Sequence, residues 1–299
     1  MSKARITTAH VLGPGALGLV FAHQLSTQRN VTLITKATHP SLYYYTFAQH
    51  SSALTVNTTS APKESITEIW LFTKAHQCKS ALQSVLGHLH PKANIILSHN
   101  GMTNVAELID LLQPTQGLYF MLTQQAAYKP QSAEVIHVSL GPSTIGTINQ
   151  VAKKRLDTLM TDWQSAIPLL TKSTDITSAR WQKLLINLAI NPIATHFNQL
   201  NGALRAPQYA SDVMALLNEA INVAQKEGVN VVLAEALALA YQVMANTAKN
   251  RCSMLQDKLN GRETEIEAMC GYVVNMARKH GLAAPVNELY YQRIKGDKP

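Results

Sequence analysis

A glycine motif near the N-terminus has the residue types needed to hold a diphosphate. It reads Gly13-Pro14-Gly15-Ala16-Leu17-Gly18 and lies between an apolar run and a helical pattern. In that context the glycines allow a tight turn and close approach of the backbone to a pyrophosphate, and the following helix supplies unpaired N–H groups. The alternative is a glycine-rich turn that binds nothing, but the strand–turn–helix context favours a dinucleotide site.

A cation stands where such sites usually carry an acid. NAD-specific sites usually place Asp or Glu about 20 residues beyond the glycines, on the ribose 2′-hydroxyl. Here the predicted strand 31–35 is followed by Lys36, and the next acidic residue is Glu64. A lysine suits a 2′-phosphate, so the pattern predicts NADP(H) rather than NAD(H). A solvent-facing lysine beside a loop is the alternative.

Three polar residues recur at every fourth position of an otherwise apolar stretch. Lys183, Asn187 and Asn191 are separated by leucine, isoleucine and alanine. In an α-helix they would share one face, and a helix that is apolar over most of its circumference is normally buried. Buried polar groups need hydrogen-bond partners or a wet cleft. The alternative is an ordinary solvent-exposed stripe, for which asparagine is a poor helix former.

A second polar group follows further along the chain. Asn246, Asn250, Ser253 and Asp257 are spaced by four, three and four, which predicts one face of a helix. Glu263 and Glu265 come soon after, at the start of another predicted helix, where the helix dipole also favours acids. Spacing alone does not decide whether these polar and acidic residues belong to a functional site or only favour the start of a helix.

The elements that must position these residues differ between the two halves of the chain. The first half alternates apolar runs with helical patterns, which predicts a parallel sheet with helices on both faces. Its predicted strands are 6–12, 31–35, 69–73 and 95–98, its helices are 17–25 and 77–88, and 135–138 with 143–146 predict a hairpin-like pair. The second half is dominated by segments of helical period, which are 178–190, 210–227, 234–249 and 263–280. We therefore expect an α/β Rossmann-type domain over residues 1–174 and an all-α domain over 175–299.

Composition and charge exclude several classes of protein. The 299 residues are 46% apolar and 15% charged, which excludes disorder, and no uncharged stretch resembles a membrane span. The net charge is +8, but its 26 Lys and Arg are scattered, so a basic enzyme for anionic small molecules fits as well as a nucleic-acid binder. Three cysteines without metal-like spacing, and no secretory signal, predict a soluble cytoplasmic protein with no metal site.

Together these motifs resemble the ketopantoate reductase (2-dehydropantoate 2-reductase) family over nearly the whole chain. The glycine loop is generic to dinucleotide enzymes. More specific are the Lys-x3-Asn-x3-Asn-Pro helix, His99-Asn-Gly-Met, Asn201-Gly, Ser253-Met-x2-Asp and Thr-Glu265-Ile, in this order and spacing. The resemblance implies a Rossmann domain, a helical domain, an active site in the cleft between them, and NADPH-dependent reduction of 2-dehydropantoate to D-pantoate in pantothenate and coenzyme A biosynthesis.

The resemblance also implies a role for individual residues. Lys183 matches the general acid, and Glu265 matches the acid that holds the substrate hydroxyl and the lysine near the nicotinamide. The matching substrate contacts are Asn187, Asn191, Asn201, Asn250 and Ser253. The matching cofactor positions are the loop Gly13, Pro14, Gly15, Ala16, Leu17 and Gly18, with Lys36, Lys74, Asn100, Ala127 and Glu265. The implied partner is a small-molecule substrate only, in a monomer or homodimer.

The chain departs from the family pattern at three positions. Cys252 precedes Ser253 where a second serine is usual, Glu267 replaces an aspartate, and Cys270 stands where asparagine is common. Two alternatives therefore stay open. One is an NADPH-dependent reductase of another branched 2-oxo acid, and the other is an NADPH-sensing protein without turnover.

Overall fold

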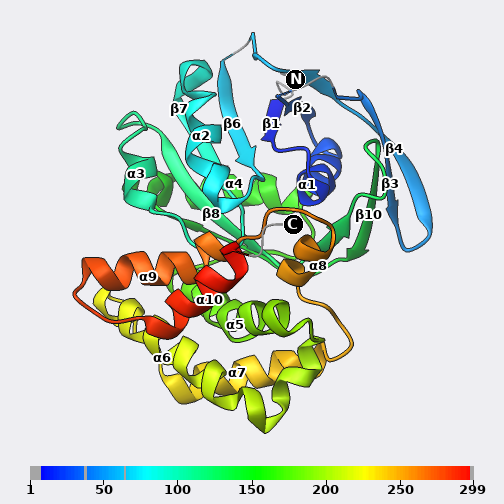
Figure 1. The fold of residues 1–299 in the computed structure, drawn as a ribbon. Coiled ribbons are helices and arrows are strands. Elements are labelled where there is room, and N and C mark those ends of the chain that lie inside the picture. The colour runs from blue at the N-terminus through cyan, green and yellow to red at the C-terminus, as the bar shows by residue number, and fades with distance from the viewer. Residues whose placement is uncertain (1–7, 37–38, 64, 297–299) are drawn as a thin grey trace. The chain divides into compact units, whose positions relative to one another are not determined.

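The computed structural model describes residues 8–36, 39–63 and 65–296. The chain forms two compact units, the first made of residues 1–99 and 104–176 and the second of residues 100–103 and 177–299. The described strands all lie in the first unit, and the second is helical (Figure 1). This confirms the predicted combination of an N-terminal α/β unit with a parallel sheet and a helical C-terminal unit.

The larger sheet of the first unit has eight strands. Their spatial order is β12 (Leu170–Lys172), β11 (Ser143–Thr147), β8 (Gly117–Thr123), β7 (Leu89–Leu97), β6 (Ile66–Leu71), β1 (Thr8–Leu12), β2 (Asn30–Ile34) and β5 (Asn57–Thr59). From β8 to β5 the strands are parallel, and Leu12 is in register with both Ile34 and Leu71. The predicted strands β1, β2, β6 and β7 are confirmed, although residues 6 and 7 lie outside the described part.

Both faces of this sheet are covered, because successive residues of its strands, such as Ile69 and Trp70, are fully buried. On one face Trp70 and Tyr119 pack in a core with α1 (Ala16–Ser26) and α4 (Gln150–Ala166). The other short helices are α2 (Cys78–Gln83) and α3 (Val105–Ile109). The predicted helix 77–88 is therefore shorter than expected, because its two ends form separate 3-10 turns.

A buried carboxylate joins three elements of the first unit. Glu68 of β6 accepts hydrogen bonds from the indole N–H groups of Trp70, at 2.8 Å, and Trp163, at 3.0 Å. Its Oε1 also lies 2.8 Å from the guanidinium of Arg29, and the two side chains are only 11% and 7% exposed. The carboxylate thus ties β6, α4 and the loop before β2 together.

A second, smaller sheet packs beside α1. Its order is β4 (His50–Thr55), β3 (Leu42–Phe47), β10 (Glu134–Ser139) and β9 (Ala126–Tyr128). The imidazole of His23 in α1 stacks on the ring of Tyr45 in β3, with centroids 3.7 Å apart. The predicted hairpin of 135–138 with 143–146 is wrong, because β10 pairs with β3 and β9 while β11 pairs with β8 and β12 of the larger sheet. Neighbouring β-prone runs do not determine their own partners.

The second unit is built from six helices in its described residues. They are α5 (Ile176–Phe197), α6 (Ala210–Lys226), α7 (Leu233–Asn246), α8 (Ser253–Leu259), α9 (Cys270–Lys279) and α10 (Pro285–Gly296). They enclose an apolar core that includes Leu188, Leu217, Val273 and Tyr290. Helix α5 is longer than predicted and continues through Pro192.

Two helical predictions for this unit are wrong. Asn246 ends α7 and Ser253 begins α8, so Asn250 lies in the loop between them and the four polar residues do not share a helix face. The predicted helix 263–280 begins only at Cys270, after a separate 3-10 turn at 266–268. In both places a backbone carbonyl bonds to a distant segment, Asn250 O to Asn201 N and Ala268 O to Met102 N.

Within the described ranges, no helix is long and apolar enough to cross a membrane. Over those same residues, no group of three or more His, Cys, Asp or Glu side chains is arranged to hold a metal ion.

Candidate active site

The glycine motif forms the turn between β1 and α1. Gly13 has φ +102°, and a Cβ there would lie 2.3 Å from the carbonyl oxygen of Phe72. A Cβ on Gly18 would lie 2.0 Å from the carbonyl oxygen of Gly13, so both positions require glycine. At Gly15, by contrast, an added Cβ meets nothing within 4 Å. The first and third glycines serve the packing of strand on helix, and the middle one faces open space.

The N-terminus of α1 is open to an anion. The first intrahelical bond runs from Leu19 N to Gly15 O at 3.0 Å, so the N–H groups of the first turn have no acceptor within the helix. No side chain caps this end, and the first turn contains no acidic residue. Unpaired N–H groups and the helix dipole together favour a bound negative charge here.

The predicted cofactor lysines lie at the same sheet edge as this loop. Lys36 is exposed and comes two residues after β2, and Lys74 is half-buried and comes three residues after β6. Both strands are hydrogen-bonded to β1, and Ile34 and Leu71 are in register with Leu12. Ligands of open α/β sheets collect at this edge, where the strand order reverses. Ala127, the other predicted cofactor residue of this unit, lies in β9 of the smaller sheet.

No motif in the sequence marks Lys129, which the fold places against the glycine loop. Its ammonium nitrogen donates a hydrogen bond to the carbonyl oxygen of Pro14, at 3.1 Å. The two residues are 115 positions apart in the chain. Only the pairing of the smaller sheet, which carries β9 to α1, brings them together.

In the second unit, the predicted acid Lys183 and its predicted partner Glu265 influence each other. Lys183 lies in α5 and Glu265 is a buried residue just before the 3-10 turn at 266–268. Burial lowers the pKa of Lys183, and the charge of Glu265 opposes this by raising it. A lysine in this situation gives up its proton more readily than one in water, as a general acid near neutral pH requires.

Asn100 belongs to the second unit and contacts the same carboxylate. Its side-chain amide donates to Glu265 Oε2 at 3.3 Å. The next residues hold it there, since Met102 N donates to Ala268 O at 2.7 Å. Gly101 has φ +70°, and a Cβ on it would lie 2.6 Å from Ala268 O, so the close approach needs glycine. The prediction placed Asn100 with the cofactor residues, and the structure brings it to Lys183's acidic partner.

The two asparagines that follow Lys183 on α5 differ in their surroundings. All three predicted residues lie in this one helix. Asn187 is half-buried. Asn191 is buried, and its amide N–H lies 3.7 Å from the sulfur of Met269.

Two further predicted substrate residues, Asn201 and Asn250, come together where two loops run side by side. Asn201 N donates to Asn250 O at 3.0 Å, and the Asn201 amide donates to the hydroxyl of Thr247 at 3.0 Å. The side-chain oxygen of Asn201 is buried and accepts no hydrogen bond. Asn250 and Ser253 are exposed. This pairing of loops thus brings Asn201 and Asn250 together although no helix face joins them, and Ser253 follows three residues later at the start of α8.

The unusual Cys252 has a structural position next to Ser253. It is the N-cap residue of α8, and its sulfur accepts from Leu255 N at 3.4 Å. Its thiol also lies 3.8 Å from the hydroxyl of Thr195. Burial raises the pKa of this thiol, so it stays protonated. Cys252 therefore caps the start of α8, where Ser253 is the first residue of the helix.

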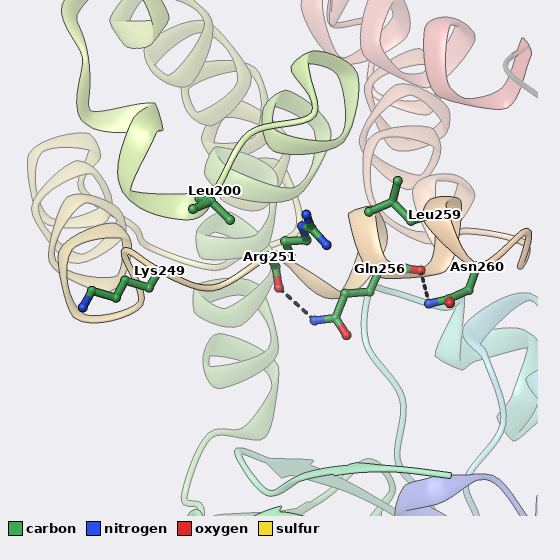
Figure 2. Close-up of a pocket in the computed structure, with 6 residues that line it drawn as sticks. All are labelled: Leu200, Lys249, Arg251, Gln256, Leu259 and Asn260. Carbon is green, nitrogen blue, oxygen red and sulfur yellow. Dashed lines mark hydrogen bonds between the residues drawn. The ribbon is translucent and has the colours of Figure 1, made fainter. Parts of the chain in front are cut away.

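A pocket of about 560 Å³ adjoins these two loops in the second unit (Figure 2). It is lined by Leu200, Lys249, Arg251, Gln256, Leu259 and Asn260. The side-chain amide of Gln256 donates to the backbone carbonyl of Arg251, and that of Asn260 donates to the backbone carbonyl of Gln256. Each amide therefore already makes one hydrogen bond to another residue of the pocket lining. None of the predicted site residues lines the pocket, but its residues flank Asn201 and Asn250 along the chain.

Comparison with known proteins agrees with the geometry of both units. The profile of the ketopantoate reductase PanE/ApbA family matches residues 9–150, and the profile of its C-terminal region matches residues 175–298. The chain is 34% identical to 2-dehydropantoate 2-reductase of Vibrio cholerae over 290 residues, which cover 95% of this chain and 96% of the relative.

Solved structures share the fold over the full length. A probable 2-dehydropantoate 2-reductase of Bacillus subtilis matches with a TM-score of 0.84 and 25% identity, covering 97% of this chain and 99% of that one. D-mandelate dehydrogenase, solved with NADH and anilino(oxo)acetate, matches with a TM-score of 0.89 at 19% identity and 98% coverage of both chains. The chain belongs to the ketopantoate reductase PanE/ApbA family of oxidoreductases.

Proposed function

We propose that this protein reduces 2-dehydropantoate to D-pantoate with NADPH, as in pantothenate biosynthesis. The observation that carries the proposal is that the half-buried Lys183 lies near enough to Glu265 for the carboxylate to raise the pKa of the lysine, in a chain 34% identical to a 2-dehydropantoate 2-reductase. Reduction of a 2-oxo acid places negative charge on the carbonyl oxygen, and a nearby ammonium stabilises that charge and supplies the proton.

The residues of the first unit fit a nicotinamide dinucleotide phosphate. The open N-terminus of α1 and the open face of Gly15 suit its pyrophosphate, and Lys36 suits its 2′-phosphate. When bound, the cofactor supplies the hydride, so the protein has to bind and orient the cofactor and the substrate and to polarise the substrate carbonyl.

In the proposed mechanism the second unit provides the acid and the substrate contacts. Lys183 donates its proton from Nζ to the carbonyl oxygen, and Glu265 holds the ammonium and accepts a hydrogen bond from the terminal hydroxyl of the substrate. Asn187, Asn191, Asn201, Asn250 and Ser253 are the proposed substrate contacts, as neutral groups that orient an anion without adding a strong charge beside Lys183. The buried oxygen of Asn201, which accepts no hydrogen bond in the protein, suits a substrate hydroxyl.

Absorbance of the reduced nicotinamide tests the proposal directly. Oxidation of NADPH is followed with 2-dehydropantoate, pyruvate, 2-oxoisovalerate and phenylglyoxylate, with NADH as the cofactor control. A strong preference for 2-dehydropantoate with NADPH is expected. Activity confined to another 2-oxo acid would refute 2-dehydropantoate as the substrate. Binding of NADPH without turnover of any 2-oxo acid would instead support a sensor.

A second candidate is the reduction of a different branched or aryl 2-oxo acid. D-mandelate dehydrogenase shares the fold of the chain from end to end, and Cys252 departs from the usual serine next to Ser253. Phenylglyoxylate, the oxidation product of mandelate, separates this candidate from the first.

Cofactor choice is predicted to depend on Lys36. The Lys36→Asp variant places a carboxylate at the end of β2, where it repels a 2′-phosphate and accepts from a 2′-hydroxyl. We expect weaker binding of NADPH and equal or tighter binding of NADH, measured by fluorescence titration of each nucleotide. Lys154→Asp, at an exposed lysine of α4, is the control. Unchanged affinity for NADPH in Lys36→Asp would exclude the assignment.

The alkaline limb of the pH profile is predicted to depend on Glu265. Turnover needs protonated Lys183 and therefore falls as pH rises through its pKa. Because Glu265 raises that pKa against the lowering effect of burial, Glu265→Gln lowers it further. The fall in kcat should then begin at lower pH in Glu265→Gln than in the wild type. Glu263→Gln, at an exposed neighbour, should leave the profile in place. An alkaline limb that does not move in Glu265→Gln contradicts the coupling.

A further inference from the structure

Lys129 follows β9 directly and reaches the glycine loop from the smaller sheet. Its ammonium donates to Pro14 O at 3.1 Å, beside the open N-terminus of α1. Figure 1 shows α1 next to β10, and β10 is the strand that pairs with β9. The position of Lys129 is therefore set by the sheet and the helix together.

A buried chain of polar side chains fixes the segment that carries Lys129. Gln24 of α1 donates to Gln125 Oε1 at 2.9 Å, and Gln125 N donates to the hydroxyl of Thr123 at 3.0 Å. The hydroxyl of Ser143 donates to that of Thr123 at 2.9 Å. These groups are buried, so the bonds hold the backbone after β8 against α1. Lys129 is thus preorganised at the loop.

The electrostatic surroundings of Lys129 are neutral as far as the described residues reach. Its side chain is half-buried, and burial lowers its pKa. In the described ranges no carboxylate pairs with it, and its neighbours are the Pro14 carbonyl and the ring of Tyr43, whose centroid is 6.0 Å from the ammonium. A partly dehydrated cation with only neutral partners is stabilised strongly by a nearby anion.

We propose that Lys129 binds the pyrophosphate of the cofactor and forms, with the N–H groups of α1, the phosphate site of this protein. The inference rests on the proposed use of NADPH and adds a residue that no glycine motif predicts. In this proposal the two lysines bind different phosphates of the cofactor. Lys36, at the end of β2, binds the 2′-phosphate, and Lys129 binds the diphosphate.

Nucleotide fragments separate the two lysines. Binding of NADPH, 2′-phospho-ADP-ribose and adenosine 2′-monophosphate is measured by calorimetry or fluorescence on the wild type, Lys129→Met, Lys129→Arg and Lys36→Ala. We expect Lys129→Met to weaken NADPH and 2′-phospho-ADP-ribose by about 10- to 100-fold, the usual effect of one charge-assisted hydrogen bond. Adenosine 2′-monophosphate, which has no 5′-phosphate, should lose less than about twofold, and Lys129→Arg should retain most of the binding. Lys36→Ala should weaken all three.

Several outcomes overturn the inference. Unchanged affinity of Lys129→Met for 2′-phospho-ADP-ribose means that the lysine does not touch the diphosphate. Equal weakening of all three ligands, with a lower midpoint of thermal unfolding without ligand, means that Lys129 only holds the loop. Lys154→Met, at an exposed lysine of α4, controls for net charge and should change nothing. If the wild-type protein does not bind NADPH, the proposed function is wrong. If Lys129→Met binds NADPH as tightly as the wild type does, only the role of Lys129 is wrong.

Discussion

Lys183→Ala is expected to lower kcat by about 10²- to 10⁴-fold, the usual contribution of a general acid. The variant removes the ammonium that is coupled to Glu265, whereas the phosphate loop and its lysines lie in the other unit of the chain. NADPH affinity should therefore stay close to the wild-type value. Lys183→Met keeps most of the side-chain volume at this half-buried position and should show the same loss. The measurement is single-turnover NADPH oxidation together with an NADPH titration.

Asn250→Ala and Ser253→Ala are the matched comparisons for this prediction. Both side chains are exposed and come from the loop and the first turn of α8, so their loss should not disturb the core. We expect them to raise KM for the 2-oxo acid and to leave kcat largely intact. Equal loss of kcat in all three variants would show that the roles of acid and substrate contact are divided wrongly.

Glu68→Ala is expected to cost about 3–5 kcal/mol of the free energy of unfolding of the first unit, the usual cost of breaking a buried ion pair. The variant leaves the guanidinium of Arg29 and two indole N–H groups without their shared acceptor in a nearly closed site. Glu68→Gln should cost less, because its amide oxygen still accepts from one indole. Urea unfolding followed by circular dichroism and by tryptophan fluorescence gives these values.

An exposed ion pair supplies the control for Glu68. Lys79 and Glu107 are paired, but their side chains are 51% and 49% exposed. Glu107→Gln should therefore leave the unfolding midpoint unchanged. A Glu68→Ala protein that unfolds at the same urea concentration as the Glu107→Gln protein would mean that solvent, rather than Glu68, satisfies Arg29.

Local patterns predicted the parts of the protein that depend on neighbouring residues. The glycine turn follows from glycines that pack strand on helix, and the parallel strands follow from apolar runs separated by helical ones. Lys183, Asn187 and Asn191 lie in one helix because period alone determines which residues share a face. The family resemblance, carried by ordered motifs, then indicated the chemistry.

Three of the failures share one physical cause, which is a bond to a distant segment. Asn250 leaves the predicted helix because its carbonyl pairs with Asn201, and α9 begins late because Ala268 O bonds to Met102. The smaller sheet was missed for the same reason, since β10 pairs with β3, which lies far away in the sequence. Lys129 gains its place only through that sheet. Neither the periodicity nor the spacing of residues in the sequence predicts which distant segment a strand or loop will bond to.

The short segment 100–103 also limits how the gene of this protein can be recombined with those of its relatives. A simple crossover after residue 176 would join a foreign second unit to the native Asn100 and Met102, which bond to Glu265 and Ala268 of the exchanged part. The two units therefore cannot be exchanged between related genes independently of each other. A working chimera must transplant the four residues with the C-terminal half, as a noncontiguous block, or keep both partners of each contact compatible.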